Sequence, residues 1–203
     1  MRSGGVYFEL DGQDIREAAR RQGRAASKEL PGAIEEALTV VSYRARKAER
    51  KNAKERLDRP TPFAENSFAA AKGQRTPQGY ESRLYVMAAM AGIYARLEFG
   101  GYTQRGLAIA DPSVENQYGG LGPGGVKKLL RRPRTLEAKF RGVHGVYQRE
   151  ANGRKLTLLV SFVRHPVYEP QLGYTEVAVD AGFTFPAEVA RQLEKRLKAA
   201  GYR

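Results

Sequence analysis

The amino-acid sequence predicts an α+β fold, in which a long basic helix and a C-terminal helix pack on a small antiparallel sheet. Two stretches, 31–58 and 186–200, place apolar residues every three or four positions, which is typical of amphipathic helices. Between them, short apolar runs are separated by glycine, proline and asparagine, which is typical of strands joined by turns. The length of 203 residues fits a single domain, residues 1–203.

The N-terminal region predicts a short strand followed by a helix. Residues 5–10 alternate apolar and other side chains and stop at an Asp-Gly turn signal. The alternating apolar residues are Val6, Phe8 and Leu10. Residues 13–30 are rich in alanine and arginine and predict a helix, whose middle is weakened by Gly23.

The longest predicted helix begins near Pro31, because proline suits the first turn of a helix. It ends near Asp58, because Pro60 and Pro62 cannot continue it. The residues of its apolar stripe are Ile34, Leu38, Val41, Ala45 and Ala48. Much of its remaining surface is basic, so one side is expected to face the core and the other to face solvent or a partner.

The middle of the chain predicts smaller elements and an arm. Residues 60–80 predict a loop with a short edge strand or helical turn, and residues 82–87 predict a strand. Residues 88–101 predict a short helix that ends at a pair of glycines. In residues 102–134 the periodicity is lost while glycine, proline and charge accumulate. That segment predicts an extended, glycine-rich basic loop or arm.

Three further apolar runs precede the C-terminal helix. Residues 138–148, 155–163 and 175–183 predict strands of the small antiparallel sheet. Asn152-Gly153 lies between the first two runs and is a strong signal for a hairpin turn. The C-terminal helix carries acidic residues near its start and basic residues near its end, as the helix dipole favours.

The formal net charge of +13 is concentrated in two blocks, 44–59 and 127–155. The first block holds eight basic and three acidic residues, and the second holds ten basic and two acidic residues. Such clustering favours an anionic partner over a basic surface that serves solubility alone. The residues that we expect to meet this partner are Lys127, Lys128, Arg131, Arg132 and Arg134 of the arm, and Arg44, Lys47, Arg50, Lys51 and Lys54 of the long helix.

No sequence pattern indicates catalysis. The chain has no cysteine, and its two histidines, His144 and His165, are 21 positions apart, which is not the spacing of a metal-binding pair. The run GGLGPGGVKK at 119–128 satisfies G-x-G-x-x-G, but no buried strand precedes it and a valine stands where a Walker loop needs lysine. We therefore expect a protein that is not an enzyme, with no catalytic, cofactor-binding or metal site.

Three stretches of the chain form a pattern with a known counterpart. The first is VYFELDG, followed after one helix by the basic helix ALTVVSYRARKAERKNAKERL. The second is YARLEFGG at 94–101, and the third is the basic hairpin GVYQREANGRKLTLLVSFVRHPVYEP at 145–170, followed by the terminal helix. In this arrangement the chain resembles the tail completion or neck proteins of tailed phages, the family of minor tail protein Z. The glycine-rich segment 119–134 departs from that pattern.

The resemblance implies a structural virion protein that forms a ring, expected to be a hexamer, at the head–tail junction and joins the tail to the head connector. Its implied partners are copies of itself and the tail terminator, tail tube or head-closure proteins. Its implied location is the virion, after assembly in the host cytoplasm, and no membrane partner is expected. The basic face would contact either the DNA in the channel or an acidic protein ring. The alternative function is nucleic-acid binding outside a virion.

Overall fold

The computed structural model describes residues 5–151 and 153–202, with the side chains of its helices and strands described from residue 26 onward. Its longest helix packs against its C-terminal helix and a small antiparallel sheet, so the predicted α+β class is confirmed. The predicted strand at the N-terminus is present, but the apolar alternation predicted for residues 5–10 concerns side chains outside the described part.

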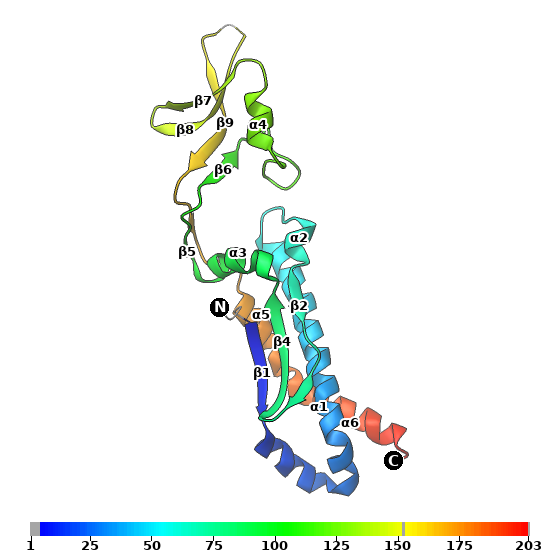
Figure 1. Cartoon of the computed structure of the whole chain (residues 1–203). Helices are drawn as coiled ribbons and strands as arrows, with labels where there is room; N and C mark the ends of the chain where they lie inside the picture. Colours follow the sequence, from blue (N-terminus) through cyan, green and yellow to red (C-terminus); the bar gives the residue numbers. More distant parts are fainter. Residues whose placement is uncertain (1–4, 152, 203) are drawn as a thin grey trace.

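The chain forms an elongated body from which a smaller lobe projects (Figure 1). We define the body as residues 5–102 and 167–202, and the lobe as residues 103–166. The two are joined by a short ribbon in which β5 (Gly101–Tyr102) pairs with β10 (Val167–Tyr168). The lobe therefore leaves the body and returns to it through adjacent strands.

Besides the β5–β10 ribbon, the body combines five helices with one four-stranded antiparallel sheet. Strand β4 pairs with β1 along one edge and with both β2 and β3 along the other. The helices are α1 (Gly12–Arg56), α2 (Pro62–Glu65), α3 (Ala88–Phe99), α5 (Tyr174–Phe183) and α6 (Phe185–Ala199). The strands are β1 (Gly5–Asp11), β2 (Phe68–Ala70), β3 (Gln74–Thr76) and β4 (Gly79–Val86).

Helix α1 is broken at Gly23, where φ is 85° and ψ is 173°. Glycine adopts this left-handed φ without a steric penalty, because it lacks a Cβ. The prediction that a new helix begins at Pro31 was wrong, since Pro31 lies inside α1 and the chain stays helical through it. The helix ends at Arg56, close to the predicted end, and the prolines that follow explain why.

The buried face of α1 repeats every four residues rather than every 3.6. The completely buried positions of this series are Ala33, Ala37, Val41, Ala45, Glu49 and Ala53. A four-residue repeat drifts by about 40° per step, so the buried face turns gradually around the helix. The prediction was therefore wrong at Ala48, which is exposed, while the neighbouring Glu49 is buried.

Two apolar clusters of the body follow this rotation. Near the middle of the long helix, Ile34 and Leu38 pack with Leu193 of α6. Near its C-terminal end, Phe68 of β2 stacks on Tyr94 and Tyr174, with ring centroids 5.1 and 6.0 Å apart. The same helix thus organises two cores, one with α6 and one with α3 and α5.

The prediction of a strand at 175–183 was wrong, because these residues form helix α5. The helix starts after Gly173, and the carboxylate of Glu98 accepts hydrogen bonds from the backbone N–H groups of Tyr174 and Thr175 at 2.6 and 2.9 Å. A carboxylate at this position satisfies donors that a helix start leaves unpaired. The capping group comes from α3, far away in the sequence, so the local pattern did not reveal it.

The lobe is a four-stranded antiparallel sheet in the order β6-β9-β8-β7 with one short helix. Its elements are β6 (Leu107–Ala110), α4 (Gly125–Leu130), β7 (Thr135–Phe140), β8 (Val143–Arg149) and β9 (Leu156–Val163). The predicted hairpin of two apolar runs is present as β8 and β9. Asn152 of its predicted turn lies outside the described residues.

The first predicted run of the lobe, 138–148, is two strands rather than one. A tight turn at Arg141-Gly142, with φ values of 48° and 84°, separates β7 from β8. Positive φ at both central residues is the signature of a type I′ hairpin turn. The arm predicted at 102–134 does extend from the body, and it also contributes β6 and α4 to the lobe.

Candidate interaction surfaces

The five basic residues predicted in the arm lie together on and just after α4. The side chain of Leu129 anchors this helix in a small core with Val146 and Val160, against which Val126 and Leu130 of the same helix also pack. The five exposed side chains are Lys127, Lys128, Arg131, Arg132 and Arg134. Within the described part of the chain, none of them forms an ion pair with a carboxylate. We call this surface the α4 basic cluster.

The lobe carries most of the net charge of the protein. Residues 103–166 contain twelve basic and four acidic side chains, a net charge of +8 out of +13. Two of the four carboxylates are paired with cations, Glu115 with Arg59 of the body and Glu150 with Lys155. The lobe therefore presents an electrostatic surface that attracts polyanions and acidic proteins.

Two arginines of the lobe occupy backbone conformations that favour glycine or asparagine. Arg134 has φ 62° at the corner between α4 and β7, and Arg141 has φ 48° at the tip of the β7–β8 turn. A left-handed conformation costs a side-chain-bearing residue about 1–2 kcal/mol. The sequence keeps arginine at both corners despite this cost, which is consistent with a role for their charges at the surface.

The basic block of α1 is less available than the arm. The guanidinium of Arg44 lies 3.0 Å from the carboxylate of Glu188 on α6, and Lys51 is 3.6 Å from Glu55. Arg50 is half-buried, with its Nε atom out of contact with solvent. The exposed Lys47 and Lys54 complete the block. The block lies on the body rather than on the lobe, so the structure does not merge it with the α4 basic cluster.

Lys47 also borders a shallow groove of about 450 Å³ on the outer side of α1. Its lining residues are Thr39, Val40, Tyr43, Arg44, Lys47 and Lys72. Three of these side chains are basic, and the guanidinium of Arg46 lies 4.7 Å from the centroid of the Tyr43 ring nearby. The groove is therefore a second positively charged feature, separate from the lobe.

Glu188 is a structural partner of the α1 block. Burial by itself would raise its pKa, but hydrogen bonds from Arg191 and Gln192 and the charge of Arg44 hold that pKa below its ordinary value. Its carboxylate thus stays ionised and joins α1 to α6. Arg44 is committed to this contact, which reduces its share in any external interaction.

We predict that Glu188→Gln lowers the free energy of unfolding by about 1–2 kcal/mol at pH 7, because charge-assisted hydrogen bonds are lost. Since the folded pKa is depressed, this contribution is present above the unfolded pKa of 4.5 and is lost as the pH falls through the folded value. Urea denaturation at several pH values measures it. Glu194→Gln, on the exposed side of α6, is the control and should change stability little. An equal loss in both variants would contradict the prediction.

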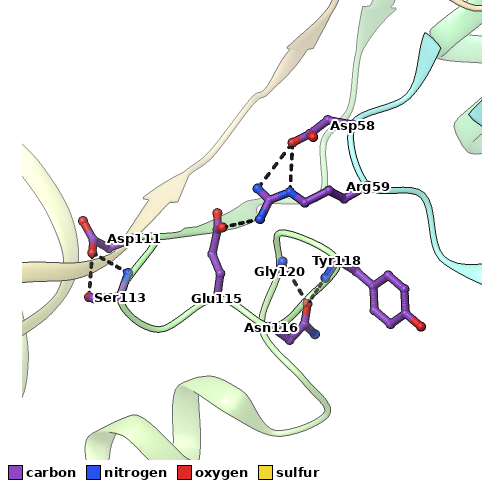
Figure 2. A network of polar contacts seen from close by, with 8 residues as sticks. All are labelled: Asp58, Arg59, Asp111, Ser113, Glu115, Asn116, Tyr118 and Gly120. Carbon is purple, nitrogen blue, oxygen red and sulfur yellow. Dashed lines mark hydrogen bonds and ion pairs between the residues drawn. The ribbon is translucent and has the colours of Figure 1, made fainter. Parts of the chain in front are cut away.

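A polar joint ties the lobe to the end of α1 (Figure 2). Arg59, which has φ 45°, donates a hydrogen bond to Glu115 of the lobe at 2.8 Å and also contacts Asp58. Gly119 lies directly against its guanidinium, where a Cβ would come within 2.8 Å of the nitrogen. The lobe is therefore joined to the body at two places: through the β5–β10 ribbon and through the contacts of its loop with Arg59.

The glycine-rich run is shaped by turns rather than by a phosphate-binding geometry. The side chain of Asn116 accepts hydrogen bonds from the backbone N–H groups of Tyr118 and Gly120, at 2.9 and 3.3 Å (Figure 2). The helix that follows, α4, is only six residues long and begins after Gly124, with φ 68°. The run thus serves as a folded connection that presents the α4 basic cluster.

One face of the lobe sheet is covered by α4, and no helix among the described residues packs over the other. By register, the residues of the uncovered face are Leu136, Ala138, Phe140, Val143, Gly145, Tyr147, Arg149, Leu156, Leu158, Ser161, Val163, Leu107 and Ile109. Several large members are exposed, among them Ile109 at 49% and Phe140 at 46%, whereas Tyr147 is buried with its ring edge-on to that of Phe140. We call it the lobe apolar face. It has no acidic residue, and the guanidinium of Arg141 lies 5.4 Å from the Phe140 ring centroid at its margin.

Helix α5 exposes a face that is negatively charged, opposite in sign to the lobe. Val179 and Phe183 are 45% and 78% exposed, and Glu176 and Asp180 lie on the same side by helical spacing. We call these four residues the α5 face. The sequence contains a signal for it, since no lysine or arginine occurs from residue 165 to residue 190 of a chain with net charge +13. Residues 175–183 were predicted as a strand, which would not place these four residues on one side, so that prediction missed this face.

Glu49 is a buried carboxyl group that the sequence did not single out. It is completely inaccessible, and neither of its oxygens has a hydrogen-bond partner among the described residues. Burial raises its pKa to about 8. The amide of Asn52 opposes this rise from nearby, although its hydrogen bond in the structure goes to the carbonyl of Leu172, and the charge of Glu98 adds to the rise. Glu49 is therefore mostly protonated at neutral pH. It lies on α1 between Ala45 and Ala53, which belong to the cluster beneath α5.

The histidines stand apart from one another. His144 lies on the α4 side of the sheet, 3.0 Å from Glu137 and edge-on to the ring of Phe162, while His165 is exposed at the end of the lobe. The described residues contain no group of three or more His, Asp or Glu side chains placed to hold a metal ion. Among the same residues, no helix has the length and apolar character needed to cross a membrane.

Comparisons with known proteins add no relative. No protein-family model, no curated protein and no solved structure matches the chain. The surfaces of the lobe and the body are therefore the basis for a function.

Proposed function

We propose that the protein is a structural component of a phage tail, a neck or tail completion protein that forms a ring at the head–tail junction. One observation above all supports the proposal: a basic lobe with an uncovered apolar face projects from a body that has its own core. Uncovered apolar faces on a soluble subunit are typical of protein interfaces. In this proposal the body provides the wall of the ring, and the lobe reaches a neighbouring subunit or partner.

Ring formation is the expected result of purifying the chain and mixing it with tail-tube, terminator or connector proteins. Mass photometry at low and high salt measures the masses of the assemblies. We expect a closed oligomer, either alone or with one of these partners, and its mass gives the number of subunits. A chain that remains monomeric with every one of those partners would refute the proposal.

A second candidate, nucleic-acid binding outside a virion, is favoured by the net charge of +8 on the lobe. Phosphate contacts release counterions, so the logarithm of the binding constant falls with the logarithm of the salt concentration by about 0.9 per contact. If this candidate is correct, the monomer binds duplex DNA. Changing the α4 basic cluster to alanine then reduces the salt slope by roughly one unit per lost contact.

The matched control for that measurement changes Lys47, Lys51 and Lys54 of α1 to alanine. It removes basic residues from the body and leaves the lobe intact. Fluorescence anisotropy with a labelled duplex at several salt concentrations measures both variants. A monomer with no salt-dependent binding would eliminate this second candidate. A slope that changes equally in both variants would show that the lobe is not the DNA-binding surface.

A further inference from the structure

We propose that the ring is built by one specific contact: the α5 face of one copy docks on the lobe apolar face of the next copy. This inference rests on the proposed function and identifies its self-association surfaces. It assigns one occupant, a second copy of this chain, to the uncovered face of the lobe sheet.

The lobe apolar face offers the first half of the contact. The side chains of Leu107, Ile109, Phe140 and Val143 are all exposed on it, and no helix of the described structure packs over them. Burial of such side chains stabilises an interface by roughly 25 cal/mol per Å² of apolar area before the cost of association is subtracted. An apolar sheet face accepts an amphipathic helix well, as in the sheet–helix layers inside domains.

The charge at this face selects its occupant. The register places Arg149 on the face, Arg141 lies against the ring of Phe140, and the face has no carboxylate. A partner that combines apolar side chains with negative charge is therefore complementary, because opposite potentials favour encounter and correct orientation. A surface rimmed by lysine or arginine is disfavoured for the same reason.

The α5 face meets both requirements within the same protein. Val179 and Phe183 supply the apolar contacts, and Asp180 and Glu176 supply the negative charge. Helix α5 has no basic residue. The surface around the groove on α1 does not match the lobe apolar face, because Arg44, Lys47 and Lys72 line that groove and are basic. The α5 face is thus a surface of the described structure that matches the lobe.

The two surfaces belong to different parts of one molecule. Helix α5 packs on α1, α6 and β1 of the body, whereas the lobe apolar face belongs to β6–β9 beyond the connecting ribbon. A contact between different surfaces of identical subunits is heterologous. It propagates head to tail, and it forms a ring when the rotation between subunits closes. The proposed contact therefore has the symmetry that a ring requires.

Disulfide crosslinking tests the contact directly, because the chain contains no cysteine. Two single variants are prepared in the full chain, Ile109→Cys on the lobe apolar face and Val179→Cys on the α5 face. They are mixed, alone or with the tail partner that drives assembly, and oxidised. A covalent dimer should form in the mixture at least about tenfold more than in either variant by itself, since each disulfide needs its Cα atoms within about 7 Å.

The matched control replaces Ile109→Cys with Val167→Cys, which is an exposed apolar position at the junction, outside the lobe apolar face. It should give background crosslinking with Val179→Cys. Preferential crosslinking of Val167 instead would overturn the inference. Dimers formed by Ile109→Cys alone at the level of the mixture would overturn it too, because they show lobe-to-lobe pairing.

Charge reversal provides a readout that does not depend on cysteine. Asp180→Arg and Arg141→Glu should each weaken assembly about tenfold, and the double variant should recover much of that loss. Circular dichroism checks that each variant is folded, since both positions are exposed. Single losses without recovery in the double variant would contradict direct pairing of these surfaces.

The results separate this inference from the proposed function. A ring that forms with full yield while Ile109 and Val179 fail to crosslink refutes the docking contact and leaves the proposed function intact. A chain that neither forms a ring nor crosslinks with any tail partner refutes both. A ring with specific crosslinking between Ile109 and Val179 supports both.

Discussion

Replacement of Glu49 with glutamine is expected to stabilise the protein by up to about 3 kcal/mol at pH 7. Glu49 is completely buried, without hydrogen-bond partners for its carboxylate oxygens among the described residues, and its pKa is raised to about 8. Glutamine has nearly the same shape but cannot ionise. It therefore removes the cost of keeping a proton on a buried acid that ionises readily in the unfolded chain.

The sign of the pH dependence follows from the raised pKa. Below about pH 4.5 the carboxyl group is protonated in both the folded and the unfolded state, and the native protein has its full stability there with respect to this group. As the pH rises from 4.5 to about 8, the unfolded state releases the proton and the folded state keeps it. Stability is lost over this window, so the advantage of Glu49→Gln should grow through it and then level off.

Thermal and urea unfolding between pH 4.5 and pH 9 measure this difference. For a chain of this size, 3 kcal/mol corresponds to an increase in Tm of roughly 6–12 °C. Glu55→Gln on the exposed side of α1 is the control and should show little change at any pH. A Glu49→Gln variant whose advantage is constant with pH would show that Glu49 is not protonated in the folded protein.

Substitution of Phe68 with alanine is expected to cost about 3–5 kcal/mol of unfolding free energy. Its ring is 1% exposed and lies stacked on Tyr94 and Tyr174, which come from α3 and α5. Removal leaves a cavity between three elements, and the rigid aromatic neighbours limit its collapse. The hydroxyl groups of both tyrosines donate hydrogen bonds to backbone carbonyls, to Ala64 at 2.7 Å and to Leu84 at 3.0 Å, which holds the rings in place.

Equilibrium urea denaturation gives the unfolding free energy of Phe68→Ala. Phe63→Ala is the matched control, because it removes the same side chain from the same segment at a position that is 58% exposed. It should change stability by less than about 0.5 kcal/mol. A loss of less than about 1 kcal/mol for Phe68→Ala would mean that the stack does not hold α3 and α5 on the body.

Glu49 and Phe68 also show why the α5 face is positioned where it is. Both lie in or next to the cluster beneath α5, and Glu98 caps the start of that helix. Asn52 of α1 donates a hydrogen bond to the carbonyl of Leu172 at 2.7 Å, just before the helix. The proposed docking surface therefore rests on a dense set of contacts rather than on a mobile loop.

Periodicity in the sequence was sufficient for the elements that bury one regular face. It predicted the C-terminal helix, the stripe of Ile34, Leu38, Val41 and Ala45, and the hairpin of β8 and β9. These predictions succeeded because local spacing and burial agree in such elements. Composition likewise identified the α4 basic cluster, since clustering of like charges is already visible along the chain.

Tertiary structure decided the features that depend on residues far apart in the chain. It buried Glu49 and left Ala48 exposed, because the buried face of α1 turns gradually away from the apolar stripe that the sequence predicted. It made 174–183 a helix, because Tyr174 and Ala178 pack in the cluster on α1 and Glu98 caps the start from α3. It also left one face of the lobe sheet uncovered, which no spacing reveals, since burial depends on which elements pack over a face.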